Sequence, residues 1–393
     1  MIFIAQTREG KEISYIDRKR YLWLLSVLNP SVPGLSALLI VFTQNVWFAL
    51  LPIITYYVVF PILDIFVGED PNNPPEEVVE QMAEDNYYRL LLFLSVPIFY
   101  FSFFATIYGA ATQDMPLWAS MALVFGAGTA SGSGLTVAHE LGHKQNIYDQ
   151  WGGKIMSALT GYGHFNIEHN RGHHMHVATP EDAASARMGE SIYAFVSREI
   201  PAVLRRGWAL EAVRLERKGL PFFHWRNDIL QGYAITILIA AALIAVCGLV
   251  ALPFILFHHI VGWYQLSQAN YIEHYGLKRA RKENGKYEPC QPKHSWNTNH
   301  IVSNLALFHL QRHSDHHTNP IRPYQSLRNF DDIPHLPSGY PGCFALAAIP
   351  PLWRKVMDPK IHSWAGGDVT LTNVVPRLEE RYREKFQRWS EDA

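Results

Sequence analysis

The sequence predicts an all-α integral membrane protein with six transmembrane helices and a histidine-rich cap on the cytoplasmic side. The 393-residue chain has a net charge of −1 and 48% hydrophobic residues, but its charges are unevenly distributed. Four stretches contain no charged residue: 21–63, 90–113, 115–138 and 229–272. Since one helical span needs roughly 20 apolar residues, the first and last stretches suffice for two spans each and the others for one each. Uncharged runs of about 40 residues are hard to accommodate as buried helices of a soluble domain.

The order of these stretches gives the expected spans and their orientation. The N-terminal segment 1–20 ends in the charged run DRKR and has no cleavable signal pattern, so we expect it in the cytoplasm, ahead of an uncleaved first helix. The first membrane part, 21–138, is expected to contain four spans and an acidic cytoplasmic loop at 68–86. The second membrane part, 229–273, is expected to contain two more. The first four spans are expected at 21–42, 46–67, 88–108 and 116–138.

Six spans return the chain to the cytoplasmic side after the fourth and after the sixth. Segment 139–228 and tail 274–393 are then both cytoplasmic. All the clustered histidines lie in these two segments. The topology and the histidine positions are independent observations, and together they predict that the clusters meet at the cytoplasmic membrane surface.

Nine histidines occur in four short motifs: HELGH, EHNRGHH, NYIEHYG and LQRHSDHHTNP. On a helix, residues at i, i+3 and i+4 share a face, so imidazoles with these spacings can converge on a metal. The candidate ligands are His139, His143, His169, His173, His174, His274, His313, His316 and His317.

Neutral imidazole is a ligand for iron, zinc, copper and nickel. One structural zinc takes four ligands and one catalytic zinc takes three, so nine ligands are too many for one metal. They suit two metals with four or five ligands each, leaving room for a small molecule. Carboxylates next to the ligands are candidates for orienting the imidazole rings. These carboxylates are Glu140, Glu168, Glu273 and Asp315.

The other histidines have no cluster and are expected to be ordinary hydrogen-bonded residues. Two of them, His258 and His259, lie in the final expected span, where ionisable groups are often functional. Because they have no cluster partner, we expect them to pack or to form hydrogen bonds.

A rival motif is embedded in the first cluster. HELGH also matches H-E-x-x-H, the signature of zinc metalloproteases, in which Glu140 would act as the general base. A membrane zinc protease is therefore an alternative of a different class. It would leave the other histidine clusters without a role.

Other classes find less support. The net charge is near zero and no long basic stripe occurs, which argues against nucleic-acid binding. The three cysteines are widely spaced and form no disulfide framework, zinc ribbon or iron–sulfur motif. The run GAGTASGSG at 126–134 has the spacing of a dinucleotide loop, but it lies inside an expected span with no strand before it. Close packing of helices through small residues accounts for it better.

The histidine boxes resemble those of the integral-membrane di-iron oxygenases and desaturases. Within that group, HELGHK, EHNRGHHMHVATPEDAASAR, NYIEHYGL and LQRHSDHHTNP resemble the bacterial alkane 1-monooxygenases. NYIEHYG is the specific element, because fatty-acid desaturases and sterol-type hydroxylases lack it in this form. The resemblance covers essentially the whole chain, including the tail around PYQSLRNFDDIPHLPSGY.

The resemblance implies two irons held by the nine histidines, in an enzyme of the bacterial inner membrane with its active site on the cytoplasmic side. It implies terminal hydroxylation of medium-chain n-alkanes with O₂ and electrons from rubredoxin, itself reduced by an NADH-dependent rubredoxin reductase. A related hydroxylase or desaturase of another apolar chain, of the xylene or fatty-acid type, would have similar boxes and stays open.

Two further expectations follow from this resemblance. Rubredoxins are small and acidic, so a basic segment could steer one to the enzyme. This segment contains Lys278, Arg279, Arg281 and Lys282. Bulky side chains lining a tunnel between the spans would set the alkane length. Candidates on size alone are Tyr56, Tyr57, Phe60, Trp118 and Phe125.

Overall fold

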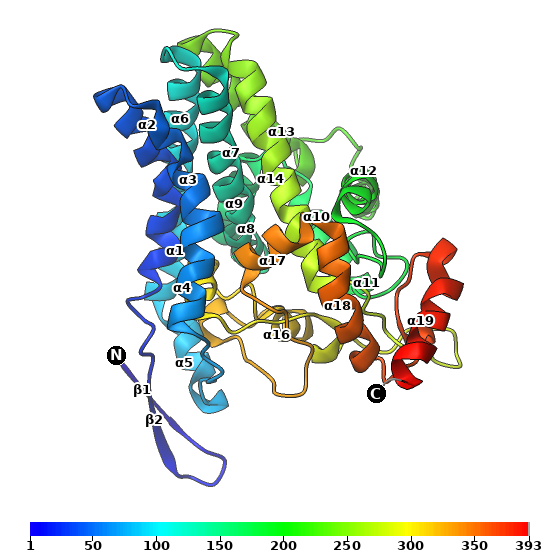
Figure 1. Cartoon of the computed structure of the whole chain (residues 1–393). Coiled ribbons are helices and arrows are strands. Elements are labelled where there is room, and N and C mark those ends of the chain that lie inside the picture. The colour runs from blue at the N-terminus through cyan, green and yellow to red at the C-terminus, as the bar shows by residue number, and fades with distance from the viewer. Residues whose placement is uncertain (392–393) are drawn as a thin grey trace.

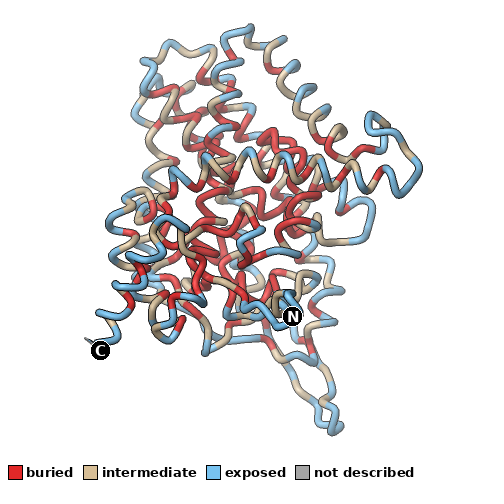
Figure 2. The backbone as a smooth tube through the Cα atoms, turned by 90° about the vertical axis from the view of Figure 1, so that its right-hand side faces the viewer, coloured by how far each residue is buried: buried red, intermediate tan, exposed pale blue. Residues whose placement is uncertain are grey.

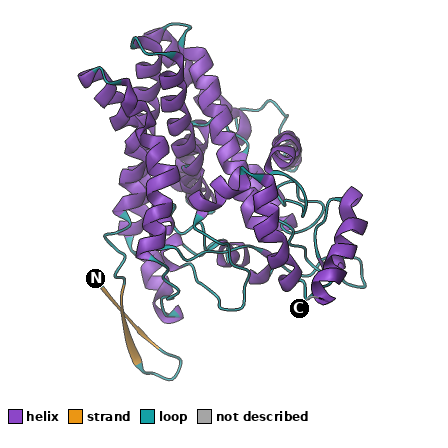
Figure 3. Ribbon diagram, in the orientation of Figure 1, coloured by secondary structure: helices purple, strands orange, loops and turns teal. Residues whose placement is uncertain are grey.

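The computed structural model describes residues 1–391 as a bundle of long helices with a loop-rich layer at one end (Figures 1 and 3). Five helices are long and apolar enough to cross a membrane. They run over Leu24–Thr43, Val46–Val67, Asn86–Thr112, Leu117–Gly142 and Asp228–Cys247. The first four agree closely with the spans predicted at 21–42, 46–67, 88–108 and 116–138, and the fifth lies in the second predicted membrane part, so the predicted helical membrane architecture is confirmed in this form.

The rest of the second predicted membrane part, where the sixth span is expected, contains α14 (Ala251–His274), whose 24 residues lie within the 20 to 27 residues of the other five helices. Its second half carries polar residues such as Gln265 and Asn270, and for this reason its composition falls short of a typical membrane span. Its first half exposes Leu252, Leu256 and Ile260, which recur every four residues on one face. The first half of α14 therefore has an exposed apolar face, and its second half carries buried polar residues.

The first two spans are assembled from shorter pieces. Each of Pro30, Pro33, Pro52 and Pro61 lies in the first turn of a new piece, where a missing backbone N–H does least harm. The pieces are α1 (Leu24–Leu28), η1 (Asn29–Ser31), α2 (Val32–Thr43), η2 (Val46–Leu50), α3 (Leu51–Ile54), η3 (Thr55–Val59) and α4 (Phe60–Val67). Of these, η3 is a π-turn, a wider turn that is frequent at functional sites.

Polar caps define where later helices begin. Asp85 accepts a hydrogen bond from the N–H of Tyr87 at the start of α6 (Asn86–Thr112). Asn227 does the same for the first N–H groups of α13 (Asp228–Cys247). Such caps satisfy N–H groups that have no partner within the helix.

Helix α7 (Leu117–Ser133) continues into α8 (Leu135–Gly142) and packs closely against α14. A Cβ atom added at Gly128 would lie 2.6 Å from Cβ of Val261, and one added at Gly132 would lie 2.7 Å from the carbonyl oxygen of Gly262. The small residues of the run GAGTASGSG therefore allow the close approach of the two helices, as predicted.

Large apolar side chains are exposed along the outer faces of the spans. Phe66 is 83% exposed, Ile65 74%, and Leu238 on α13 69%. Figure 2 shows the buried residues gathered in the interior and at the junction of the bundle with the loop-rich layer. Extensive apolar exposure is unusual in a soluble protein and fits contact with lipid.

The loop-rich layer lies at the same end as both chain ends (Figure 1). The remaining helices, in this layer or beside the bundle, are α5 (Val79–Glu84), α9 (Ile147–Ala158), α10 (Phe165–Glu168), α11 (His174–His176), α12 (Ile192–Glu216), α15 (Ile301–Ala306), α16 (His313–Thr318), α17 (Tyr340–Ala347), α18 (Pro350–Trp364) and α19 (Glu379–Glu391). The short 3₁₀ turns are η4 (Glu76–Val78), η6 (Pro292–His294), η7 (Tyr324–Ser326), η8 (Val369–Leu371) and η9 (Pro376–Leu378), and η5 (His169–His173) is a second π-turn.

The N-terminus adds one β-hairpin to the otherwise helical fold. Strands β1 (Ile2–Gln6) and β2 (Glu12–Ile16) form an antiparallel hairpin that pairs Ile2 with Ile16. Both strands have an alternating pattern, and Gly10 has the positive φ that the turn requires. The charged residues of the segment obscure this pattern in the sequence.

A buried arginine ties the layer together next to the last histidine motif. The Arg312 guanidinium donates to the carbonyl oxygens of Asp70 at 2.6 Å and of Leu327 at 2.7 Å. Burial lowers the pKa of Arg312 to about 10, so it remains a cation at neutral pH. Through these bonds the loop after the second span and the segment near Leu327 are held around α16.

Candidate metal centre

The nine clustered histidines come together from four places in the chain. They stand at the end of α8 and just after it, on η5 and α11, at the last residue of α14, and on α16. All are buried or half-buried. They form two groups, in each of which the candidate ligand atoms lie within 4.8 Å of one another. The first group is His139, His143, His169, His174 and His316, and the second group is His173, His274, His313 and His317.

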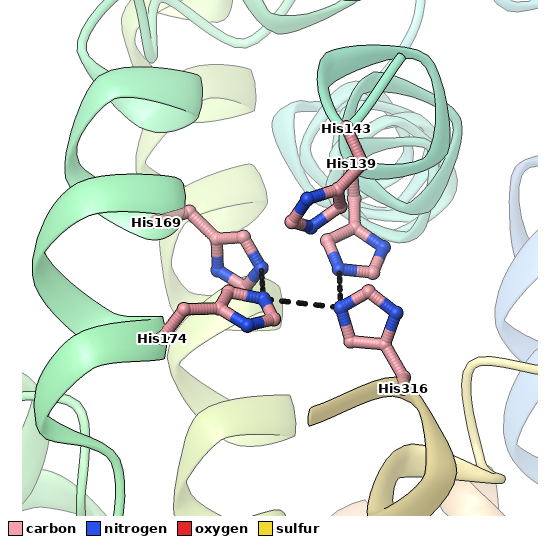
Figure 4. Close-up of side chains that lie close together, drawn as sticks. All are labelled: His139, His143, His169, His174 and His316. Atoms are coloured by element: carbon pink, nitrogen blue, oxygen red, sulfur yellow. Dashed lines mark hydrogen bonds between the residues drawn. The ribbon is translucent and has the colours of Figure 1, made fainter. Parts of the chain in front are cut away.

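Figure 4 shows the rings of the first group pointing toward one another from three sides. Nε2 of His316 lies 2.7 Å from Nε2 of His139 and 3.1 Å from Nε2 of His174. Nε2 of His174 lies 3.0 Å from Nε2 of His169. The ring of His143 stands edge-on to that of His139, with centroids 4.8 Å apart.

The second group has the same crowding of ring nitrogens. Nε2 of His317 lies 2.8 Å from Nε2 of His313 and 3.2 Å from Nε2 of His173. Nε2 of His313 also lies 3.2 Å from Nε2 of His274. Each group therefore contains two rings whose Nε2 faces two other ring nitrogens.

Hydrogen bonds alone do not account for this arrangement. The nitrogen of a neutral imidazole either donates one hydrogen bond or accepts one, so it cannot serve two further nitrogens. Ligand nitrogens at about 2.0–2.1 Å from one metal ion stand roughly 3 Å apart when they are at right angles. The observed separations are of this size, and the donor set fits a metal ion in each group.

The protonation state of four of the rings fits the same role. Removal from water lowers the pKa of His169, His174, His316 and His317 well below the usual range. These rings are therefore neutral at physiological pH, as metal ligation requires. The pKa of His173 differs: burial lowers it, but the neighbouring Asp182 carboxylate raises it above the usual value.

The π-turn η5 decides how EHNRGHH is divided between the groups. Its N–H···O=C bond runs from His174 to His169, five residues apart instead of four. The wider turn places His169 beside His174 in the first group and turns His173 into the second. The sequence left open which of these histidines share a metal, and the structure separates His173 from the other two.

Asp182 is a candidate residue of the metal centre that the sequence analysis did not identify. Nδ1 of His173 donates to Oδ2 of Asp182 at 2.9 Å, and Arg206 binds both Asp182 and Glu168. Burial alone would raise the pKa of Asp182, but the contacts with His173 and Arg206 hold it well below its usual range. A carboxylate in this position orients the ring and strengthens it as a ligand. The only hint in the sequence is that Asp182 follows the candidate ligand His173 by nine residues.

The four predicted carboxylates behave differently from one another. Glu273 accepts a hydrogen bond from the hydroxyl of Tyr340 at 2.7 Å and lies 3.4 Å from Nε2 of His313. Glu140 stands farther from a ring, with its Oε1 4.0 Å from Nδ1 of His139. Both are therefore placed beside a histidine ring.

Glu168 and Asp315 do not bond to a histidine within the described residues, which corrects their predicted role. Glu168 binds Arg206, and Asp315 binds Arg328 at 2.7 Å. Asp315 lies two residues after His313, and this spacing turns a helical side chain to the opposite face. Both carboxylates hold arginines that support the surrounding layer.

An apolar cavity, here called the inner chamber, opens between the two histidine groups. Its lining includes His139 and His169 of the first group and His313 of the second. The remaining wall is largely hydrophobic: Leu135, Phe165, Leu266, Ala269, Leu307, Leu310 and Phe344, with Gly132, Ser133, Thr136, Gln265, Asn270, Glu273 and Tyr340. A small apolar group in this chamber would face both groups.

A second cavity, the outer chamber, lies next to the inner one. Three of the predicted tunnel residues, Tyr56, Tyr57 and Phe60, line it. Trp118 and Phe125 line neither chamber. Trp118 is 44% exposed and packs on Trp47, and at 1.5 Å per residue it stands about 30 Å along the continuous α7–α8 helix from the first histidine group.

The histidines outside the two groups have ordinary partners. Nε2 of His258 and the hydroxyl of Ser131 are 2.9 Å apart, and Nδ1 of His258 is 3.2 Å from Nδ1 of His259. His164 contacts the hydroxyl of Tyr233 at 3.0 Å. These contacts agree with the expectation of hydrogen-bonded, structural histidines.

Comparison with known proteins supplies an independent view of the same region. The fatty acid desaturase family model matches residues 116–344, a segment that contains all nine clustered histidines. Alkane 1-monooxygenase of Ectopseudomonas oleovorans is 49% identical over 372 residues, which cover 95% of this chain and 93% of the relative. Alkane 1-monooxygenase 1 of Alcanivorax borkumensis is 47% identical over 373 residues, covering 95% and 92%. Alkane 1-monooxygenase of Pseudomonas putida is 48% identical over 372 residues, again covering 95% and 92%.

Proposed function

This chain belongs to the alkane 1-monooxygenases within the fatty acid desaturase family, and on that premise we propose that it hydroxylates the terminal carbon of medium-chain n-alkanes. The reaction consumes the alkane, O₂, two electrons and two protons and yields the 1-alkanol and water. The observation that carries the proposal is the inner chamber, an apolar cavity bordered by histidines of both groups.

The nine histidines are proposed as ligands of two irons, five in the first group and four in the second. Bound there, the irons would supply activation of O₂ and the oxidising power needed to replace a C–H hydrogen by a hydroxyl. The choice of iron over zinc rests on the family and on the number of nitrogen donors, which exceeds what two catalytic zinc sites would take.

The residues of the inner chamber contribute binding, orientation and exclusion of water. Leu135, Phe165 and Phe344 offer an apolar surface that favours a hydrocarbon over water. A chain held with its end between His139 and His313 presents its terminal methyl group to both groups at once. Fixing the reacting group in this way is worth several kcal/mol of barrier (about 7–11 at most) and favours the terminal over the internal C–H bonds.

We propose that α14 is the sixth span and that the histidines lie at the cytoplasmic face of the bacterial inner membrane. The exposed apolar face of its first half supports a lipid contact. Of the basic residues before the first span, Lys19 pairs with Asp70, whose carbonyl oxygen binds Arg312 beside the last histidine motif, and such basic residues favour the cytoplasmic side. Alkane dissolved in the bilayer would then reach the chambers from the side.

Electrons are proposed to come from rubredoxin, reduced in turn by an NADH-dependent rubredoxin reductase. The chain's three cysteines are free and far apart in sequence, so they offer no redox centre of their own. In the predicted docking segment, Arg281 and Lys282 are exposed, whereas Arg279 is buried and donates to the carbonyl oxygen of Met175 at 2.9 Å. The exposed pair is therefore the better candidate for steering an acidic partner.

The test is metal analysis followed by product analysis on detergent-purified protein. About two irons per chain, with 1-octanol formed from octane in the presence of rubredoxin, its reductase and NADH, is the expected result. An alkene product or oxidation of an aromatic methyl group in preference to octane would favour the fatty-acid or xylene type. One zinc, no iron and peptide cleavage would make HELGH the site of a membrane protease.

A further inference from the structure

One polar contact crosses the apolar boundary between the two chambers. The chambers share four lining residues: Ser133, Gln265, Leu307 and Phe344. At this boundary the hydroxyl of Tyr57 donates to Oε1 of Gln265 at 3.3 Å, and Nε2 of Gln265 lies 3.5 Å from Oγ of Ser133. Gln265 belongs to α14, Ser133 to α7 and Tyr57 to the π-turn of the second span.

We infer that the Tyr57–Gln265 hydrogen bond is a gate between the two chambers, and that it disfavours alkanes too long for the inner chamber. This inference rests on the proposed function. Gln265 is only 5% exposed, so its amide needs a hydrogen-bonding partner, and an alkane cannot provide one. A chain that extends from one chamber into the other must displace this contact.

The gate acts differently on short and long substrates. In the proposed gate, an alkane short enough for the inner chamber passes the boundary, and the Tyr57–Gln265 bond forms again behind it. A long alkane with its end at the histidines still occupies the boundary and keeps the bond open. Loss of this bond therefore weakens the binding of long alkanes relative to short ones. The contacts of the alkane end near the histidines are the same for both.

The local backbone also singles out this point. Tyr57 lies in the π-turn η3, between α3 and α4, and π-turns inside helices occur often at functional sites. Tyr56, its neighbour in the same turn, is anchored instead to the carbonyl oxygen of Asn29 at 3.2 Å. The two tyrosines have the same chemistry and line the same chamber, but only Tyr57 reaches the boundary residue, which makes Tyr56 a matched control.

The test is internal competition between octane and hexadecane in one reaction, with the alcohols measured by gas chromatography. The product ratio is independent of the amount of active enzyme and of electron supply. Tyr57→Phe keeps the ring and removes the hydroxyl, and it is expected to raise the hexadecanol-to-octanol ratio about three- to ten-fold, the range that one net hydrogen bond supports. Tyr56→Phe is expected to leave the ratio unchanged. An unchanged ratio in Tyr57→Phe, or an equal rise in Tyr56→Phe, overturns the inference.

A second variant separates the hydrogen bond from a simple change of volume. Gln265→Leu should raise the ratio in the same direction, and the double variant with Tyr57→Phe should raise it no further, because both changes remove one bond. Additive effects in the double variant would show that space, not the bond, sets the ratio, and would refute the gate.

A binding measurement distinguishes failure of the gate from failure of the proposed function. Octane and hexadecane that each carry a terminal diazirine are photolysed with metal-free protein, and the labelled inner-chamber peptides are quantified. Tyr57→Phe should increase hexadecane labelling relative to octane labelling, with no turnover required. If wild-type protein makes no alcohol but this shift occurs, the gate stands and the proposed reaction fails; if alcohol is made and no shift occurs, the gate fails alone.

Discussion

The two histidine groups contain the same kind of ligand but are held in different ways. The second group has four rings, all buried, and two of them stand beside carboxylates, Asp182 and Glu273. The first group has five rings, of which His143 and His174 are only half-buried, and the one carboxylate near it, Glu140, stays 4.0 Å away. In the second group Asp182 orients His173 through its Nδ1, and with only four rings this group has no ligand to spare. The first group has an extra ligand and lies nearer the outside.

The largest expected effect comes from removing one ligand on each side of this comparison. His317→Ala leaves three rings in the second group, so we expect about one metal equivalent to be lost and the hydroxylation rate to fall more than about 100-fold. His143→Ala leaves four rings in the first group and should keep both metals, with a loss of about ten-fold or less. Iron per chain and octanol formation measure both effects. Equal losses of iron and of octanol formation in the two variants would contradict the proposed difference between the two histidine groups.

The next effect concerns the residue that orients His173. Asp182→Asn weakens the hydrogen bond to Nδ1, and we expect metal affinity in the second group to fall about 10- to 100-fold. Asp149→Asn is the matched control, because Asp149 is also a buried carboxylate paired with an arginine, Arg89 at 2.8 Å, but contacts no histidine. Competition with a chelator measures the affinity. Similar metal loss in both variants would point to general destabilisation instead.

Two glutamates sharpen the comparison further. Glu273 is hydrogen-bonded by Tyr340 and lies near His313, whereas Glu140 has no comparably close ring. We expect Glu273→Gln to lower the hydroxylation rate about ten-fold and Glu140→Gln to lower it less. Steady-state rates with metal content as the control measure the difference. A complete loss of function in Glu140→Gln alone, with metal retained, would instead favour the general-base role that HELGH has in metalloproteases.

The smallest expected effect is on electron delivery. The exposed residues Arg281 and Lys282 follow closely after His274 of the second group. Their double reversal to Glu should raise KM for rubredoxin a few-fold at low ionic strength, and the effect should fade near 1 M salt, where charges are screened beyond about 3 Å. Reversal of Arg381 and Arg388 on α19 is the control. If only reversal of Arg381 and Arg388 changes KM for rubredoxin, the proposal that Arg281 and Lys282 steer rubredoxin is wrong.

The sequence was informative where the physical signal is local. Charge-free runs located five candidate spans closely, because exclusion of charged groups from lipid acts on each segment separately. The motifs likewise identified all nine histidines that the structure brings together, because imidazoles spaced at i, i+3 and i+4 share one face of a helix. The same reasoning missed the hairpin at Ile2–Ile16, where strand pairing depends on two short segments at once.

Other features depend on contacts between distant segments. Asp182 was missed and Asp315 was misassigned because proximity in sequence to a histidine does not decide which ring a carboxylate meets. Trp118 was chosen for its size, but its place at the far end of α7 removes it from both chambers.

The sequence by itself determined the family, the helical membrane architecture and the set of histidines, because hydrophobic length and imidazole spacing are properties of single segments. The tertiary structure decided how the nine rings divide into five and four: His169 and His173 on the π-turn face different groups, and so do His316 and His317 on α16. It also decided that Tyr57 and Gln265 meet between the two chambers, because that contact joins helices from distant parts of the chain. Convergence of distant segments is a property of packing, and no single stretch of sequence contains it.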